Sequence, residues 1–240
     1  MLVFGSAIIA LALVGAYWGC HETAVRLTDV ARTGGDWLRE TGRLFATVSL
    51  HDRRTASICL AALVEKFIDV LLWIFYPVFL YRQGVTLETI GIITGLYGIS
   101  WGVLQLPVGG LSDKIGRKPL VIAGMLLAAY GCTATLWYSS VLWWSGHAVI
   151  IGCGMAMLYP TLNAAISDYS PTEHRPTCIG IYRFWRDSGY LFGALVLAAA
   201  STWSGDLSTA FVVTSVSLLI SVALLLVFWR SANRTIIKPQ

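Results

Sequence analysis

Long apolar stretches alternate with short polar ones along the chain. Seven mostly apolar stretches cover residues 2–19, 57–81, 87–108, 119–138, 142–166, 178–200 and 209–229. A membrane-spanning helix needs about 20 such residues, whereas a barrel strand is shorter and alternates apolar with polar positions. The run "SVSLLISVALLLVFW" is continuously apolar, and in lipid such a backbone satisfies its own hydrogen bonds as a helix. The pattern predicts an all-α, polytopic membrane protein with about seven transmembrane helices.

The composition agrees with this class. Hydrophobic residues make up 56% of the chain and charged residues 12%, and the mean hydropathy is +0.69. A soluble domain averages about 25% charged residues, which it needs to cover its surface. The composition therefore excludes a cytosolic enzyme, a nucleic-acid-binding protein and a disordered chain.

The basic residues predict the orientation. Fifteen of the 17 Lys and Arg residues lie in 21–56, 109–118, 167–186 and the last residues of the chain. If the seven spans alternate in direction, all four regions lie on one side, which the positive-inside rule assigns to the cytoplasm. We expect a multi-pass protein of the bacterial inner membrane with a cytoplasmic C-terminus. The net charge of +4 then follows from this bias and requires no nucleic acid partner.

The spacing of the spans predicts the domain organisation. Residues 1–20 read as one transmembrane helix, since they lack the positive start of a signal peptide. A linker, 21–56, precedes a six-helix bundle at 57–230 and a cytoplasmic tail at 231–240. Within the linker, Asp36 can cap an amphipathic helix that starts at Trp37 and lies on the membrane surface, separated by Gly34 and Gly35 from a shorter helix. The alternative is a solvated linker.

The sequence offers little support for an enzyme or a metalloprotein. Its five cysteines are irregularly spaced and form neither a metal-binding pattern nor a disulfide framework. No zinc-protease motif, nucleophile elbow or pair of histidine ligands is present. We expect no cofactor, no metal and no enzymatic activity.

One turn carries a motif. The sequence "GGLSDKIGRKPL" between the third and fourth spans fits the pattern G-x-x-x-D-[RK]-x-G-R-[RK], through Gly109, Asp113, Lys114, Gly116, Arg117 and Lys118. A tight turn favours glycine, an acidic side chain can pair with arginine or a helix N-terminus, and the cations suit an anionic inner leaflet. Gly109 would also allow a neighbouring backbone to approach. The turn resembles motif A, the signature loop of the major facilitator superfamily, where it acts as a conformational switch.

This resemblance implies a fold and an activity. In that family the loop joins the second and third helices of each six-helix half, as it does here when the spans are counted from Ser57. The chain then corresponds to a C-terminal half preceded by the last helix of an N-terminal half. The implied function is a permease of the bilayer, working by alternating access, that exports a small molecule or ion in exchange for protons. The alternative is a truncated or split half-permease that is inactive alone and needs a separate N-terminal half or a second copy.

Polar residues within the spans are the candidate proton and substrate site, because such residues are costly in lipid. Glu65, Asp69, Trp73 and Tyr76 form one helical stripe at 100° per residue, and Lys66 can reach Asp69. Two close carboxylates suit proton binding, and the alternative is a structural ion pair with Lys66.

Two further spans contribute candidates. Arg183 and Asp187 have the spacing of a pair within one helix, and Arg186 either meets the carboxylates or extends to the interface. Tyr159 and Asn163 are candidate substrate contacts near a proline. The glycine pairs Gly91–Gly95 and Gly98–Gly102 have the spacing of close helix contacts.

Overall fold

The structure, a computed structural model, describes residues 34–229. Contacts divide the chain after Leu38, and the fold described below is that of the larger unit, which begins at Arg39. The predicted first span at 2–19 and the tail at 231–240 lie outside the described residues.

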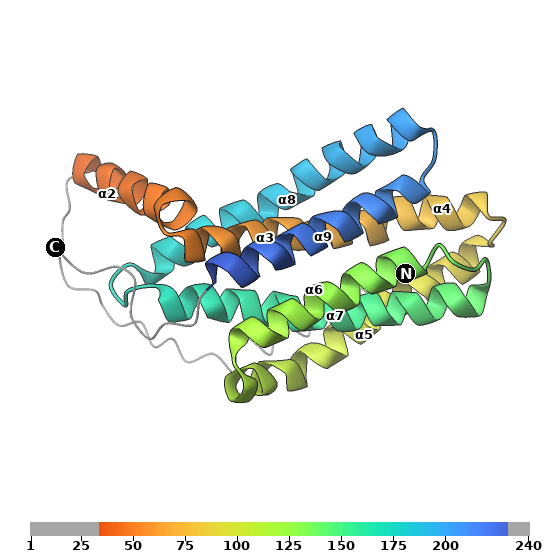
Figure 1. Ribbon diagram of the computed structural model, residues 1–240, viewed down its shortest axis with the longest axis horizontal. Coiled ribbons are helices and arrows are strands. Elements are labelled where there is room, and N and C mark those ends of the chain that lie inside the picture. Colours follow the sequence, from red (N-terminus) through yellow and green to blue (C-terminus); the bar gives the residue numbers. More distant parts are fainter. Residues whose placement is uncertain (1–33, 230–240) are drawn as a thin grey trace, which may run out of the picture. The chain divides into compact units, whose positions relative to one another are not determined.

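The described residues form helices joined by short connections and contain no strand (Figure 1). α2 (Gly34–Ala46) continues into a π-helix, η1 (Thr47–His51), and the bundle follows it. Its members are α3 (Arg53–Val70), the π-helix η2 (Leu71–Phe75), α4 (Tyr76–Arg82), α5 (Leu87–Ile115), α6 (Arg117–Ala134), α7 (Val141–Tyr169), α8 (Arg175–Ser204) and α9 (Ser208–Phe228). Because α3, η2 and α4 form one continuous rod, this part of the chain has six rods, as the six later spans predict. Among them α5, α7 and α9 are long and apolar enough to cross a membrane.

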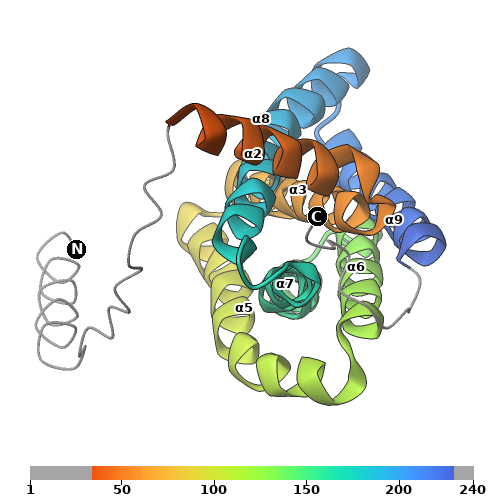
Figure 2. The same cartoon turned by 90° about the vertical axis from the view of Figure 1, so that its left-hand side faces the viewer.

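α7 is a central element of the bundle. It packs against α5 and α6, while α3 packs against α8 and α9 (Figure 2). Contacts of α6 with α9 and of α3 with α7 join the two groups. The bundle core contains apolar side chains from every rod, and the last turns of α3 contribute buried charges to it.

Local chemistry fixes several helix starts. Asp52, Thr86 and Ser140 each accept a hydrogen bond from a backbone N–H in the first turn of α3, α5 and α7. These short polar side chains satisfy donors that a helix N-terminus leaves open.

Two predicted boundaries are wrong. Gly34, Gly35 and Asp36 already lie in α2, so this helix does not start at Trp37, and the predicted shorter helix before it lies outside the described residues. The third predicted span continues to Ile115, which places Gly109, Asp113 and Lys114 in the last turns of α5. The turn itself is Gly116, whose φ of +93° favours glycine.

Glycines allow the helices to approach closely, but at positions other than those predicted. A Cβ on Gly154 would lie 2.7 Å from the carbonyl oxygen of Gly124, so α6 and α7 touch backbone to backbone. A Cβ on Gly189 would collide with the carbonyl oxygen of Leu63 on α3. Gly91, Gly95, Gly102 and Gly109 have no such neighbours within the part that the structure describes, and the Gly98 contact is a loose one to Trp73. The glycine spacing on α5 therefore does not mark a contact inside this bundle.

Gly189→Ala should destabilise the protein by about 1–3 kcal/mol, because the added methyl group forces α8 away from α3. Gly180→Ala, in the same helix, is the matched control, since a Cβ there meets no atom within 4 Å. We expect a lower thermal unfolding midpoint in detergent for Gly189→Ala, and an unchanged or slightly higher one for Gly180→Ala. Equal midpoints for the two variants would contradict the close packing of α3 and α8.

Candidate functional site

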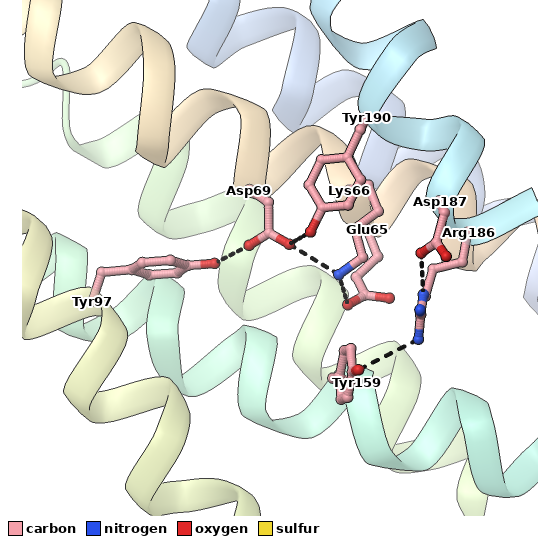
Figure 3. Close-up of polar contacts among 8 residues, drawn as sticks. All are labelled: Glu65, Lys66, Asp69, Tyr97, Tyr159, Arg186, Asp187 and Tyr190. Atoms are coloured by element: carbon pink, nitrogen blue, oxygen red, sulfur yellow. Dashed lines mark hydrogen bonds and ion pairs between the residues drawn. The ribbon is translucent and has the colours of Figure 1, made fainter. Parts of the chain in front are cut away.

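Three charged side chains lie together in the last turns of α3. The ammonium group of Lys66 lies 3.2 Å from Oε1 of Glu65 and 2.9 Å from Oδ2 of Asp69 (Figure 3). All three residues are at most 2% exposed. The predicted reach of Lys66 to Asp69 is confirmed, and Lys66 binds the second carboxylate as well. We call these three residues the ion cluster.

Two tyrosines complete the surroundings of Asp69. The hydroxyl of Tyr97 on α5 donates to Oδ1 at 2.7 Å, and that of Tyr190 on α8 donates to Oδ2 at 3.1 Å. With Lys66, this gives Asp69 three hydrogen bonds from three different helices. These contacts join α3, α5 and α8 at one carboxylate.

Glu65 is placed differently. Its Oε1 accepts from Lys66, whereas its Oε2 is buried and has no hydrogen-bond partner among the described residues. The hydroxyl of Tyr182 on α8 is likewise buried without a partner. The free oxygen of Glu65 points toward the side on which the guanidinium group of Arg186 lies (Figure 3). Such unsatisfied groups are rare in a core and indicate a place where a proton, a water or a ligand completes the structure.

Aromatic rings line the side of the ion cluster toward α5 and α7. Ring centroids are 5.8 Å apart for Trp73 and Tyr97, 6.1 Å for Tyr97 and Trp101, and 5.9 Å for Trp101 and Tyr159. We call these four residues the aromatic wall. Lys66 lies 5.0 Å from the ring centre of Tyr159, so the wall and the ion cluster are adjacent. Trp73 is half-exposed, which leaves this end of the wall open.

The predicted stripe on α3 is broken in the structure. Trp73 joins the aromatic wall, but Tyr76 is fully buried and donates its hydroxyl to the carbonyl oxygen of Trp144, 3.0 Å away. The π-helix η2 lies between Asp69 and Tyr76 and has more residues per turn than an α-helix. The angle of 100° per residue therefore does not apply across it, and Tyr76 belongs to the core beside Phe211.

The predicted pair of Arg183 with Asp187 is wrong. Asp187 accepts instead from Nε of Arg186, at 2.8 Å, while Arg183 lies exposed on α8. Arg186 also donates to the hydroxyl of Tyr159 at 3.4 Å. Arg186 thus meets neither carboxylate of the ion cluster directly, because Asp187 is a nearer partner. It remains next to the cluster through the shared contact with Tyr159.

The candidates on α7 lie on the same side of the bundle. Tyr159 contacts Lys66 and Arg186 through its ring, and Asn163 has a buried Oδ1 without a partner among the described residues. Tyr182 was missed by the sequence analysis. Its spacing of four residues from Arg186 could have indicated a shared helix face.

The motif residues form a second polar site, where α5 turns into α6. Arg117 lies 2.6 Å from Asp113 and 3.1 Å from Asp168 at the end of α7, and its Nη1 also donates to Ser112. Partial burial lowers the pKa of Arg117, but the bonds to Asp168 and Asp113 outweigh it and raise the pKa above its usual value. Arg117 therefore ties the last turn of α5 to the end of α7 as a permanent cation.

Lys118 ties the same turn to α9. Its ammonium group donates to the carbonyl oxygen of Trp229 at 2.5 Å, and the indole of Trp229 donates to the hydroxyl of Tyr169 at 3.0 Å. Through these contacts the ends of α5, α6, α7 and α9 lie close to the turn. The start of α3 is near as well, because the guanidinium of Arg54 lies over the ring of Tyr169. We call this end of the bundle the basic end. Lys114 and Asp113 are exposed there.

Arg117→Ala should loosen the α5–α6 turn, because three partners lose their common donor. Hydrogen exchange measured by mass spectrometry on the segment 109–120 should become faster, and Asp168→Asn should shift it in the same direction. Lys114→Ala is the control, since this exposed side chain forms no ion pair among the described residues. Unchanged exchange in Arg117→Ala would contradict a tying role.

Comparison of the sequence with known proteins identifies a family. Residues 58–239 match the model of the Major Facilitator Superfamily. The inner membrane transport protein YajR of Escherichia coli is 34% identical over 96 residues, covering 39% of this chain and 20% of that protein. The multidrug transporter protein MdtP of Bacillus subtilis is 32% identical over 140 residues, covering 56% and 26%. The quinolone resistance protein NorA of Staphylococcus aureus is 29% identical over 126 residues, covering 49% and 30%.

The aligned segments thus span less than a third of each of these relatives. The matched family consists of transporters rather than enzymes, and its match extends over the ion cluster, the aromatic wall and the basic end. Apolar helices long enough to cross a membrane agree with it. On this match, the chain belongs to the Major Facilitator Superfamily.

Proposed function

We propose that this bundle is one half of a proton-coupled permease that exports small organic molecules by alternating access. The observation that carries the proposal is the buried ion cluster, in which one lysine faces two carboxylates and one carboxylate oxygen has no hydrogen-bond partner within residues 34–229. Intramembrane ionisable groups are costly, and in transporters they serve as ion or proton sites.

The charges of the cluster suggest how a proton would be used. Lys66 balances one carboxylate, so the cluster carries one net negative charge when Glu65 and Asp69 are both ionised. Asp69 has three hydrogen-bond donors, whereas Glu65 has one free oxygen. A proton on Glu65 makes the cluster neutral. Its release restores one net negative charge, which a cationic substrate can neutralise in place of the proton. Glu65 is therefore the proposed proton site, and Asp69 the fixed anion.

The aromatic wall supports the class of substrate. Planar organic molecules stack on aromatic side chains, and cations bind to their faces. Trp73 is half-exposed and lies within the same row of rings as Tyr159, next to the ion cluster. Similar proteins carry the names methyl viologen resistance protein and quinolone resistance protein. We infer an organic substrate with an aromatic ring, in contact with Trp73, Tyr159 and Asn163.

Alternating access requires a second bundle that rocks against this one. α5 and α8 flank the ion cluster, and both have large exposed apolar side chains, including Leu106 at 84% and Leu191 at 62%. In a full permease a second bundle covers such faces, and the positive-inside pattern puts the basic end and the C-terminus in the cytoplasm. The second bundle comes from a separate N-terminal half or a second copy. On this view the chain alone does not transport.

Efflux should lose its dependence on the proton gradient when the proposed proton site is neutralised. The test is ethidium efflux from bacterial cells that contain the 240-residue chain together with an N-terminal half, as one polypeptide or two. Glu65→Gln should uncouple efflux from the proton gradient, so that a protonophore no longer changes the rate. Asp69→Asn should reduce efflux at least about tenfold, because it removes the fixed anion and leaves the buried ion pair with Lys66 without one partner. Glu88→Gln, at the exposed start of α5, is the matched control.

Two outcomes would overturn the proposal in different ways. Gradient-dependent efflux in Glu65→Gln would remove the proton role of this residue. Efflux by the chain alone, without the N-terminal half, would remove the half-permease.

A further inference from the structure

An apolar pocket that is partly open to the surface lies near the basic end, away from the ion cluster. It has a volume of about 310 Å³ and is lined by residues of η1, α3, α8 and α9. On α3 the lining includes Ala56, Cys59, Leu60 and Leu63, and on α9 it includes Phe228. A dry cavity of about 150 Å³ already accepts benzene, so this pocket can hold an apolar chain of several carbons.

η1 forms one wall of the pocket and is fixed in place. The indole of Trp185 on α8 donates to the hydroxyl of Ser49, at 2.8 Å, and both residues line the pocket. The ring of Phe45 stacks on Trp185 with centroids 6.1 Å apart. Since η1 is held on α8 by these contacts, the pocket is a built feature rather than a gap beneath a loose segment.

A cation stands at one end of the pocket. Arg53, the first residue of α3, lines it and is exposed, and its guanidinium lies 5.7 Å from the ring centre of Phe228. In the part of the chain that the structure describes, no ion pair involves Arg53. The nearest acid along the chain is Asp52, whose Oδ1 accepts from the backbone of Arg54. Arg53 is thus available to an anionic group from outside.

The pocket runs along α3 from this cation into the bundle. Arg53 and Leu63 are ten residues apart, or about 15 Å along a helix. The pocket therefore has a positive charge where the basic end meets the membrane surface. Its other walls are apolar and lie at the depth of the hydrocarbon. This order matches an anionic phospholipid, with a headgroup at the interface and an acyl chain below it.

We propose that this pocket binds one anionic phospholipid of the cytoplasmic leaflet. The phosphate of its headgroup pairs with Arg53, and one acyl chain enters between Leu60, Leu63 and Phe228. Leu50, which is exposed at 73%, lies beside the second chain. The lipid joins η1 to α3 and α9, so that the segment before the bundle is fixed to it through lipid as well as protein.

The experiment is native mass spectrometry of the purified 240-residue chain with added phosphatidylglycerol or phosphatidylcholine. Wild type should retain one phosphatidylglycerol and less phosphatidylcholine. Ala56→Trp and Leu60→Trp fill the pocket and should abolish retention, whereas Leu142→Trp, exposed at the opposite end, should not. Arg53→Gln should lower the preference for phosphatidylglycerol about fivefold, the effect of one basic side chain near an anionic surface. Arg175→Gln, an exposed cation at the start of α8, is its control.

Each result decides the proposal. Equal retention in wild type and both tryptophan variants would overturn it, as would equal retention of the two lipids by wild type. Loss in the tryptophan variants with an unchanged preference in Arg53→Gln would overturn the recognition of the headgroup. Two pocket-filling variants are used so that the test still stands if one of them misfolds. Size-exclusion chromatography shows whether each variant is folded and monodisperse.

Discussion

The structure depends on one lysine buried between two carboxylates. Removing three charges from water is costly, and the attraction between them compensates only when the geometry is good and other donors satisfy the oxygens. Here Tyr97 and Tyr190 bring donors from α5 and α8 to Asp69. The position of α8 follows in part from Gly189, because a Cβ there would lie 2.9 Å from the Cβ of Lys66. The ion cluster thus determines which helices surround α3 and how near they lie.

The basic end supplies the second constraint. Arg117 and Lys118 lie next to each other after Gly116, and they tie the α5–α6 turn to α7 and α9 respectively. These contacts are partly exposed and polar, while the ion cluster is buried. The contacts of Arg117 and Lys118 can open at low free-energy cost, whereas the attraction between Lys66 and the two carboxylates keeps the ion cluster intact. A bundle with a fixed centre and an openable end is suited to the rocking motion that we propose.

The sequence predicted the helical rods well, because twenty apolar residues in a row have few alternatives in lipid. It also predicted the pairing of Lys66 with Asp69, which depends only on spacing within one helix. It failed where the local helix departs from the ideal: η2 changes the angle per residue, so Tyr76 faces the core rather than the aromatic wall. It failed again where two partners competed, since Asp187 pairs with Arg186 and not with Arg183. Contacts between helices, such as Tyr97 with Asp69, have no signal in a single sequence.

The measurement that tests the account most directly is the free energy of unfolding of variants of the ion cluster. Lys66→Met should destabilise the protein by about 3–5 kcal/mol, because it leaves two buried carboxylates without a cation. Adding Asp69→Asn and Glu65→Gln to Lys66→Met should recover most of this loss, since no buried charge then remains. Such coupling between neighbouring sites is what a shared network predicts. Losses that simply add up across the three substitutions would contradict the claim that the three buried charges form one coupled network.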